Sequence, residues 1–335
     1  MENKKLSEEE INNLEKELTD LHDSIIKDLG EKDVLYIRNM IKLVKYTNLA
    51  GRLLLHFGKD PVTFMLGSFS LSVSKILENL EVGHNLMHGQ YDWTNDPELS
   101  GKVYEWDNFC SPEKWKKHHN HDHHLYTNIV GKDEDSGSIF FRMTKKQKWQ
   151  KSHFFQLFGF IVSLPFFELL IAVIHNRNKI SHDFLKHISL KILKDYIFFP
   201  LLATKNSKRV LLGNYISNTI RNIWLYFMIL SGHLPEGLEH YLEEDCINES
   251  KGQWYLRQAR STTNINGNKL FYILSGHASH QVEHHLFPDI PAIRLSDMSP
   301  QVKQILEKYG QNYNTGNFFT QFATVLKNAV KYSLP

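Results

Sequence analysis

Histidines gather in three clusters along the chain, at positions 84–88, 118–124 and 277–285. Imidazole nitrogens bind iron, zinc, copper and nickel, and histidines three or four residues apart project from the same face of a helix. A mononuclear site needs about three or four protein ligands. The number of clustered histidines therefore predicts a site for two metal ions, with the ligands His84, His88, His119, His123, His124, His284 and His285.

The second cluster holds more histidines than one site can use. On an ideal helix His119 and His123 stack one turn apart with His124 beside them, whereas His121 points about 160° away from His123. We therefore expect His118 and His121 to face solvent or to support the ligands from outside.

The third cluster leaves two alternatives for its leading position. His280 lies one turn before His284, and Gln281 lies one turn before His285, so helical spacing does not choose between them. We favour Gln281 because it keeps a gap of two residues before the paired histidines.

In the first cluster, Glu81 lies seven residues before His88 and is a candidate to orient an imidazole through its free N–H.

Bulk composition limits the possible partners. The 39 basic and 37 acidic residues give a net charge of only +2, so we expect no nucleic acid as a partner. Two cysteines cannot supply a four-cysteine iron–sulfur cluster within this chain or a disulfide framework, and they fit a reducing, cytosol-facing location. We find no phosphate-binding glycine loop, so electrons for any redox reaction must come from another protein.

Apolar stretches between the clusters predict an integral membrane protein, although the mean hydropathy is −0.38. Residues 157–174 are long enough to cross a bilayer or nearly so. Residues 62–73 and 210–230 are further candidates, the latter with a stripe of Asn214, Asn218 and Arg221 that must face a bundle interior. The shorter stretches 49–57 and 198–203 are re-entrant or interfacial candidates. The alternative is a soluble helical protein with buried helices.

Lysines at positions 116, 117, 145, 146 and 148 flank the second cluster, and the positive-inside rule assigns that loop to the cytoplasm. The predicted fold class is therefore all-α: an integral membrane helical bundle whose cytosolic helical cap holds a di-metal site on the cytoplasmic side.

Three segments follow from this reading: an N-terminal amphipathic or cytosolic segment (1–45), a membrane domain with the histidine clusters (46–298) and a C-terminal cytosolic helical tail (299–335). Ser7 and Glu10 form the pattern of a capping box that opens a helix. Its apolar positions 11, 14, 18, 21 and 25 make it amphipathic. We expect it to pack on the protein's own body, with the membrane surface as the alternative.

The three clusters and their contexts at residues 81–93, 119–128 and 281–288 resemble the histidine boxes of the membrane fatty-acid desaturases. The resemblance runs from about residue 60 to 295. It is greatest for bacterial acyl desaturases related to linoleoyl-CoA and front-end enzymes, in which glutamine leads the third box, as Gln281 does here. In that family the boxes bind two non-haem irons, and a further histidine before the third box joins them. His233 matches this position.

The resemblance implies an O2-dependent fatty-acyl desaturase that uses two Fe2+ ions and O2 to insert a double bond. The implied partners are a fatty-acyl substrate (a CoA thioester or lipid-linked), membrane lipid, and a separate electron donor such as ferredoxin or rubredoxin with its reductase. The chain lacks the His-Pro-Gly-Gly haem motif of fused cytochrome b5 domains, which also favours a separate donor.

Two alternative functions remain. A hydroxylase or ketolase on the same scaffold would deliver oxygen to the substrate, and a metal-binding or metal-transport protein would consume none. For a desaturase, candidate residues at the mouth of the substrate site are Tyr91, Asp92, Trp93, Glu105 and Trp106, although aromatic side chains near a bilayer also serve as interface anchors.

Overall fold

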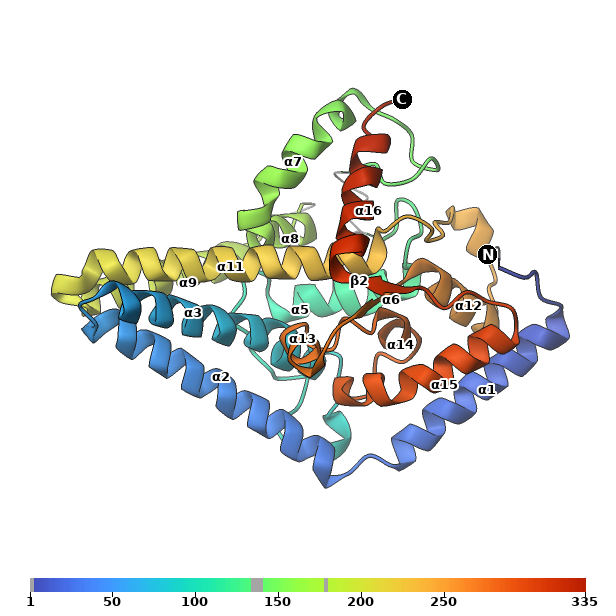
Figure 1. Cartoon of the computed structure of the whole chain (residues 1–335), viewed down its shortest axis with the longest axis horizontal. Coiled ribbons are helices and arrows are strands. Elements are labelled where there is room, and N and C mark those ends of the chain that lie inside the picture. Colours follow the sequence, from blue (N-terminus) through green and yellow to red (C-terminus); the bar gives the residue numbers. More distant parts are fainter. Residues whose placement is uncertain (1–2, 134–140, 178–179) are drawn as a thin grey trace.

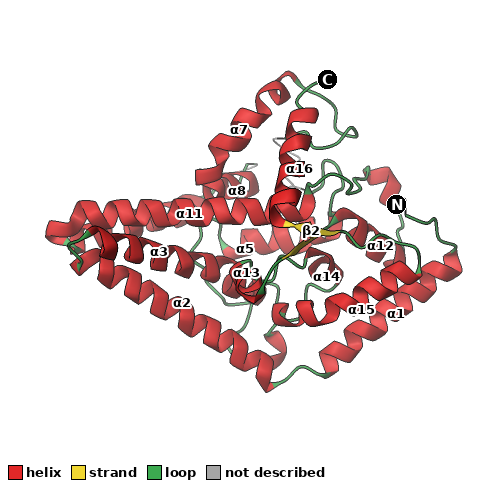
Figure 2. Cartoon of the chain, in the orientation of Figure 1, coloured by secondary structure: helices red, strands yellow, loops and turns green. Residues whose placement is uncertain are grey.

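The structure is a computed structural model of the chain, and it describes residues 3–133, 141–177 and 180–335. These residues form helices, connecting loops and a single two-stranded sheet, which confirms the all-α class (Figure 2). The two strands, β1 (Asn264–Asn266) and β2 (Thr315–Asn317), pair in parallel with Ile265 opposite Gly316.

The α-helices are α1 (Glu8–Lys27), α2 (Glu31–Phe57), α3 (Pro61–Leu77), α4 (Asn85–Met87), α5 (Pro112–Trp115), α6 (His124–Tyr126), α7 (Gln156–Ser163), α8 (Phe167–His175), α9 (His182–Ile192), α10 (Phe199–Leu202), α11 (Ser207–His233), α12 (Lys251–Ser261), α13 (Lys269–Leu274), α14 (Gln281–Leu286), α15 (Leu295–Lys308) and α16 (Phe318–Lys331). Three π-helical segments are η1 (Glu78–His84), η3 (Lys116–His123) and η6 (Leu193–Phe198). Short 3-10 segments are η2 (Asp92–Thr94), η4 (Lys151–Phe155), η5 (Leu164–Phe166), η7 (Thr204–Asn206), η8 (Glu243–Cys246) and η9 (Ala292–Arg294).

Helices α2, α3, α9 and α11 form a long arm that extends to one side of the molecule (Figure 1). Small residues allow α2 and α3 to approach closely: a Cβ on Gly51 would lie 2.9 Å from the backbone nitrogen of Leu71. The stretch 49–57, which we expected to be a separate re-entrant or interfacial piece, is instead the last part of the continuous helix α2. The stretch 198–203 falls in η6 and α10.

One stretch of the described residues, Lys151–His175, is long and apolar enough by length and composition to cross a membrane. It contains the predicted span 157–174. It is not a straight helix, because Pro165 lies in the 3-10 turn η5 between α7 and α8. Helix α7 turns away from the long arm and lies beside α16 (Figure 1). The predicted spans 62–73 and 210–230 lie within α3 and α11.

The polar stripe of α11 faces the interior of the bundle, as the sequence predicts. Asn214 is fully buried, and Arg221 is 1% exposed. Their partners come from two neighbouring elements: the Asn214 side-chain amide donates to the backbone carbonyl of Asp195 in η6, and Arg221 pairs with Glu168 in α8.

Helix α1 packs with α12, α14 and α15 around the third histidine cluster, whereas the last helix, α16, lies beside α7 and α11. The predicted capping box of α1 is present, since Ser7 and Glu10 exchange side-chain to backbone hydrogen bonds. Leu14 and Leu18 of α1 are fully buried in a core with residues of α12, α14 and α15. Helix α1 therefore packs on the protein's own body, and α2 runs without a break across the expected boundary at residues 45–46.

Two of the three π-helical segments carry histidines of the first and second clusters. A π turn is wider than an α turn and is often found at functional sites. The α-helical spacing assumed from the sequence therefore does not describe these two segments.

Candidate metal centre

Histidine side chains from four parts of the chain converge into two groups. The first group contains His84, His88, His119 and His284, and the second contains His123, His233 and His285. Within each group one nitrogen from every ring lies within 4.8 Å of the others. Helix α14 supplies one member of each group through the adjacent His284 and His285, so the two groups are neighbours.

His124 is the eighth predicted ligand, and it lies between the two groups. Its ring stacks on His285 with the centroids 4.3 Å apart, and it meets the rings of His88 and His284 at 4.7 and 4.8 Å. All eight histidines predicted from the sequence are thus brought together.

Several of these imidazoles carry buried nitrogens with no hydrogen-bond partner among the described residues: Nε2 of His88, His284 and His285, and both ring nitrogens of His124. Burying polar atoms without partners is costly, so such a cluster requires another ligand for its lone pairs. Neutral imidazole nitrogens are the donors that iron and zinc prefer. The residues present therefore fit a metal centre.

Burial keeps these rings neutral. It lowers the pKa of His84 to about 3, and it holds the pKa of His88, His124, His284 and His285 well below the ordinary value, with the neighbouring histidines adding to the effect. A neutral imidazole has a free lone pair for a metal ion, so desolvation prepares the site for binding.

Polar side chains orient three of the histidine rings through hydrogen bonds to their Nδ1 atoms. Nδ1 of His84 donates to Asn85 Oδ1 at 3.0 Å, and Nδ1 of His123 donates to Asp133 Oδ1 at 2.8 Å. Nδ1 of His285 donates to Gln258 Oε1 at 3.0 Å. In each ring this bond fixes the proton on Nδ1 and leaves Nε2 as the metal-binding atom.

Sequence reasoning did not find Asn85, Asp133 or Gln258. Gln258 lies in α12, far along the chain from His285, and no residue spacing links the two. Its amide also donates to the carbonyl of His124 at 2.9 Å, so one side chain joins the second and third clusters.

Glu81 does not orient His88, contrary to our expectation. Its carboxylate accepts hydrogen bonds from the Tyr36 hydroxyl at 2.7 Å and from Nδ1 of His277 at 3.1 Å. The structure therefore assigns Glu81 to a buried contact that joins α2, η1 and the loop before α14.

The remaining cluster residues lie outside the two groups. His121 is exposed and pairs with Asp122, whereas His118 stacks on His175 with the centroids 4.4 Å apart. His280 packs on the Tyr272 ring at 4.6 Å. Gln281, in contrast, lies beside His84 and His284 in the lining of one cavity, and its side chain packs on Gly232, where a Cβ would lie 2.6 Å from Gln281 Cγ.

That cavity has a volume of about 80 Å3 and adjoins the histidines. A water molecule needs roughly 10–15 Å3 by this measure, so the cavity holds several methylene-sized groups. Its apolar wall comes from three elements: Leu80 in η1, Phe167 and Ile171 in α8, and Leu225 and Ile229 in α11.

Of the five residues proposed for the substrate mouth, Trp106 lines this cavity. Tyr91 is buried in a separate core with Ile37, and Asp92 accepts a hydrogen bond from the backbone of Gly101. The remaining two, Trp93 and Glu105, are exposed and do not line it either.

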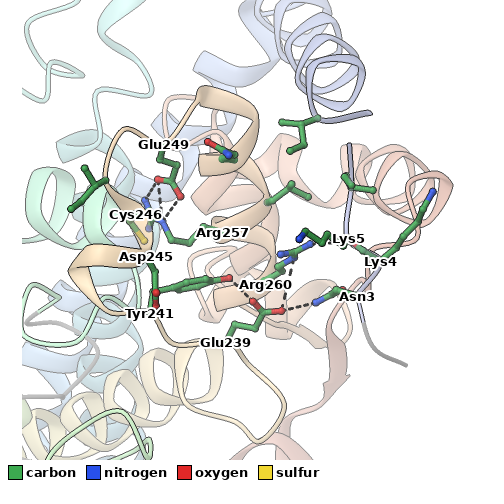
Figure 3. Close-up of a pocket in the computed structure, with 15 residues that line it drawn as sticks. Asn3, Lys4, Lys5, Glu239, Tyr241, Asp245, Cys246, Glu249, Arg257 and Arg260 are labelled. Carbon is green, nitrogen blue, oxygen red and sulfur yellow. Dashed lines mark hydrogen bonds and ion pairs between the residues drawn. The ribbon is translucent and has the colours of Figure 1, made fainter. Parts of the chain in front are cut away.

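A larger surface pocket of about 580 Å3 lies on another side of α12 (Figure 3). Arg257 pairs there with Glu249, while Glu239 binds Asn3 at 2.9 Å and lies 4.0 Å from Arg260. Positive and negative side chains alternate in this pocket, and none of the clustered histidines lines it. Arg257 also donates to the carbonyls of residues 125 and 127, so it supports the end of the second cluster.

Comparisons with known proteins agree with this site. The sequence model of the fatty acid desaturase family matches residues 61–317. The chain belongs to the fatty acid desaturase family. It is 36% identical, over 98% of its length and 82% of the relative's, to the NADPH-dependent stearoyl-CoA 9-desaturase of Mycobacterium tuberculosis.

More distant relatives are also named as desaturases. The sn-1 linoleoyl-lipid 6-desaturase of Synechocystis is 28% identical over 76% of each chain, and the human fatty acid desaturase 3 is 22% identical over 84% of this chain and 64% of its own. Members of this family are membrane-associated oxidoreductases of lipid metabolism, and the relatives support a general fatty-acyl desaturation for this chain.

Replacing Gln258 with leucine should weaken metal binding, because it removes the acceptor that fixes the tautomer of His285. Loss of such an orienting partner typically lowers metal affinity about 10- to 100-fold. Competition against a coloured chelator, with protein loaded anaerobically, measures this affinity. The matched control is Gln253→Leu on the exposed face of the same helix, which should keep the wild-type affinity. Equal affinities of the two variants would contradict the role of Gln258.

Proposed function

We propose that this protein is an O2-dependent fatty-acyl desaturase that introduces a carbon–carbon double bond with two non-haem irons and an external electron donor. The observation that carries the proposal is the position of an apolar cavity directly against two neighbouring histidine groups. The names of the relatives support desaturation over hydroxylation or metal transport.

The proposed iron ligands are His84, His88, His119, His123, His124, His233, His284 and His285. Gln281 is proposed as the leading residue of the third box, either as a weak ligand or through water, because it lines the cavity beside the first group whereas His280 does not. When bound, the two irons would use dioxygen and two external electrons to oxidise an unactivated methylene of the acyl chain.

The role of the remaining side chains is to position the acyl chain and exclude water. An alkyl chain has no polar handle near its reacting carbons, so geometry alone selects them. Trp106, Phe167, Ile171, Leu225 and Ile229 form a wall that can hold a methylene pair against the histidines. One relative is named for a CoA thioester and another for a lipid-linked chain. The similarity to the first is greater, and we propose an acyl-CoA substrate.

We place the active site on the cytoplasmic side of a membrane, because lysines 116 and 117 flank the second cluster. The proposed donor is a separate ferredoxin or rubredoxin with its reductase. The NADPH dependence in the name of the mycobacterial relative is compatible with such a chain of carriers.

Expression in a host without polyunsaturated lipids should produce acyl chains that have lost two hydrogens. Mass spectrometry of the fatty acids detects this product and the position of its double bond. His285→Ala should abolish the product, whereas the matched change His121→Ala, at an exposed histidine outside both groups, should leave it. Products that gain an oxygen atom would show that the protein is a hydroxylase instead of a desaturase. If cells that express the unmutated protein form no new product, both functions are contradicted.

The purified chain should need an added electron carrier, because no nucleotide-binding motif supplies electrons from within. Oxygen uptake with acyl-CoA and NADPH alone should stay at background. It should rise when ferredoxin and ferredoxin reductase are added, and the rise should require acyl-CoA. Turnover by the highly purified chain with NADPH alone would refute an external donor.

A further inference from the structure

The cavity beside the histidines extends along helix α11. Along α11 its lining residues are His233, Ile229 and Leu225, which lie four residues apart and share one helix face. The helix rises 1.5 Å per residue, so these side chains line about 12 Å of the cavity. The histidines therefore mark one end, and the level of Leu225 marks the other.

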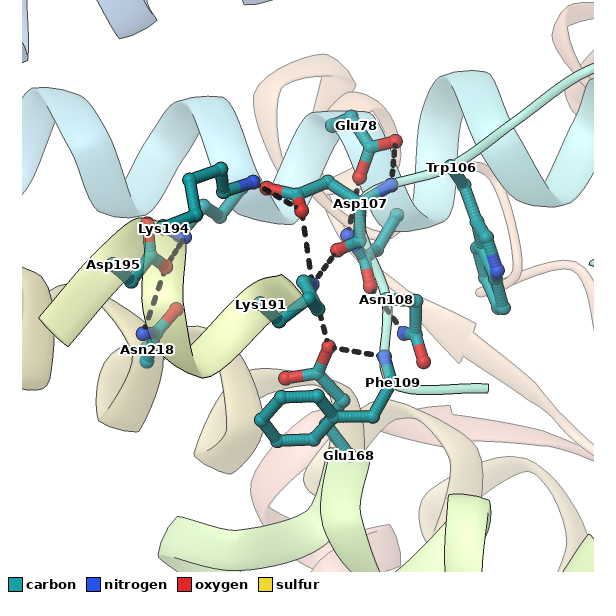
Figure 4. Close-up of polar contacts among 12 residues, drawn as sticks. Glu78, Trp106, Asp107, Asn108, Phe109, Glu168, Lys191, Lys194, Asp195 and Asn218 are labelled. Atoms are coloured by element: carbon teal, nitrogen blue, oxygen red, sulfur yellow. Dashed lines mark hydrogen bonds and ion pairs between the residues drawn. The ribbon is translucent and has the colours of Figure 1, made fainter. Parts of the chain in front are cut away.

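The far end of the cavity is polar. Its lining there consists of Asn79, Asn108 and Glu168, and the amide of Asn108 donates to Asn79 Oδ1 at 2.8 Å. The Glu168 carboxylate accepts hydrogen bonds from the backbone of Phe109 at 2.9 Å and from Lys191 at 2.8 Å (Figure 4). An otherwise apolar cavity thus ends on a buried charged group.

Further charges lie directly behind that end. Arg221 occupies the next turn of α11 beyond Leu225 and pairs with Glu168, and these two side chains are 1% and 3% exposed. Lys191 also pairs with Asp107 at 3.2 Å (Figure 4). We call Glu168, Arg221, Lys191 and Asp107 the charged floor.

A second helix places charges at the same level. Lys75 lies one turn before Asn79 and binds Asp195 at 2.7 Å, with both side chains at most 5% exposed. Arg52 of α2 binds Asp195 from the other side at 3.1 Å. The charged floor is therefore backed by further ion pairs.

A charged floor resists an alkyl chain more strongly than an apolar wall. Apolar side chains can change rotamer to admit another methylene, whereas opening the floor would leave buried charges unpaired. Breaking a buried ion pair costs several times what burying one methylene gains. The methyl end must be the end that reaches the floor, because a CoA or lipid head group is too large and too polar to pass along this cavity.

We propose that the charged floor stops the methyl end of the acyl chain and so limits the length of chain that can extend beyond the carbons held at the histidines. This inference rests on the proposed desaturase function. It assigns Glu168 and Arg221 as specificity-determining residues that contact neither the irons nor the reacting carbons.

The test exchanges both charges together. The double variant combines Glu168→Leu with Arg221→Met, so the net charge of the protein is unchanged. Lys191 keeps Asp107 as its partner. Apolar replacements of a buried ion pair are often tolerated. Saturated acyl-CoAs of increasing length are supplied to the iron-loaded, donor-coupled enzyme, and kcat/KM is measured for each. Wild type should show a sharp upper limit of length. The double variant should accept chains beyond it, with about a tenfold gain or more for the first excluded chain.

Two further variants complete the experiment. The same exchange at Arg294 and Asp33, an ion pair between α2 and η9 that does not line the cavity, should leave the length limit unchanged. Ile229→Ala widens the cavity one turn nearer to the histidines, above an intact floor, and should also keep the limit. It therefore tests the proposal even if the double variant does not fold. A folded, active double variant with the wild-type limit, or a longer limit in Ile229→Ala, would overturn the proposal. A wild-type enzyme that desaturates no acyl-CoA would instead count against the proposed function.

Discussion

Burial of histidine nitrogens that no described protein group satisfies is the constraint on which this structure depends. His124 has two such nitrogens, and His88, His284 and His285 have one each. Desolvation keeps the rings neutral, and hydrogen bonds to Asn85, Asp133 and Gln258 fix the proton of three rings on Nδ1, so that Nε2 can bind a ligand. Without another ligand this arrangement would cost stability. We propose that two metal ions would accept the lone pairs of these rings, so that the interaction that performs the chemistry would also hold the clusters together.

The rest of the molecule keeps these rings in place. The core of α1, α12, α14 and α15 encloses the third cluster. Gln258 in α12 contacts both His285 and the carbonyl of His124, and therefore ties two clusters to one helix. Helices α8 and α11, with Leu80 of η1, then supply the apolar wall of the cavity, and its charged floor comes from α8, α9, α11 and the loop residue Asp107.

The sequence predicts the parts of this arrangement that follow from local patterns. The capping box of α1, the apolar stretches in α3 and α11 and the inward stripe of α11 all depend on residue periodicity. The convergence of seven histidines was predicted because three similar clusters have few other physical uses, and the resemblance to the desaturases added His233.

Other features could not be predicted, because they depend on contacts between distant residues. The π-helical turns of η1 and η3 change the directions of side chains that α-helical spacing places elsewhere. The bond of Glu81 to His277, the role of Gln258 and the pairing of Glu168 with Arg221 each join segments that no spacing relates. Trp106 reaches the cavity while its neighbour Glu105 does not, since the direction of a side chain in a loop depends on the packing around it.

Elemental analysis combined with Mössbauer spectroscopy is the decisive test of whether the histidine groups hold two irons. The full chain, prepared anaerobically from iron-replete cells, should contain two irons per chain in nitrogen-rich, high-spin ferrous environments, with little zinc. Stoichiometric zinc without iron after the same preparation would contradict the account.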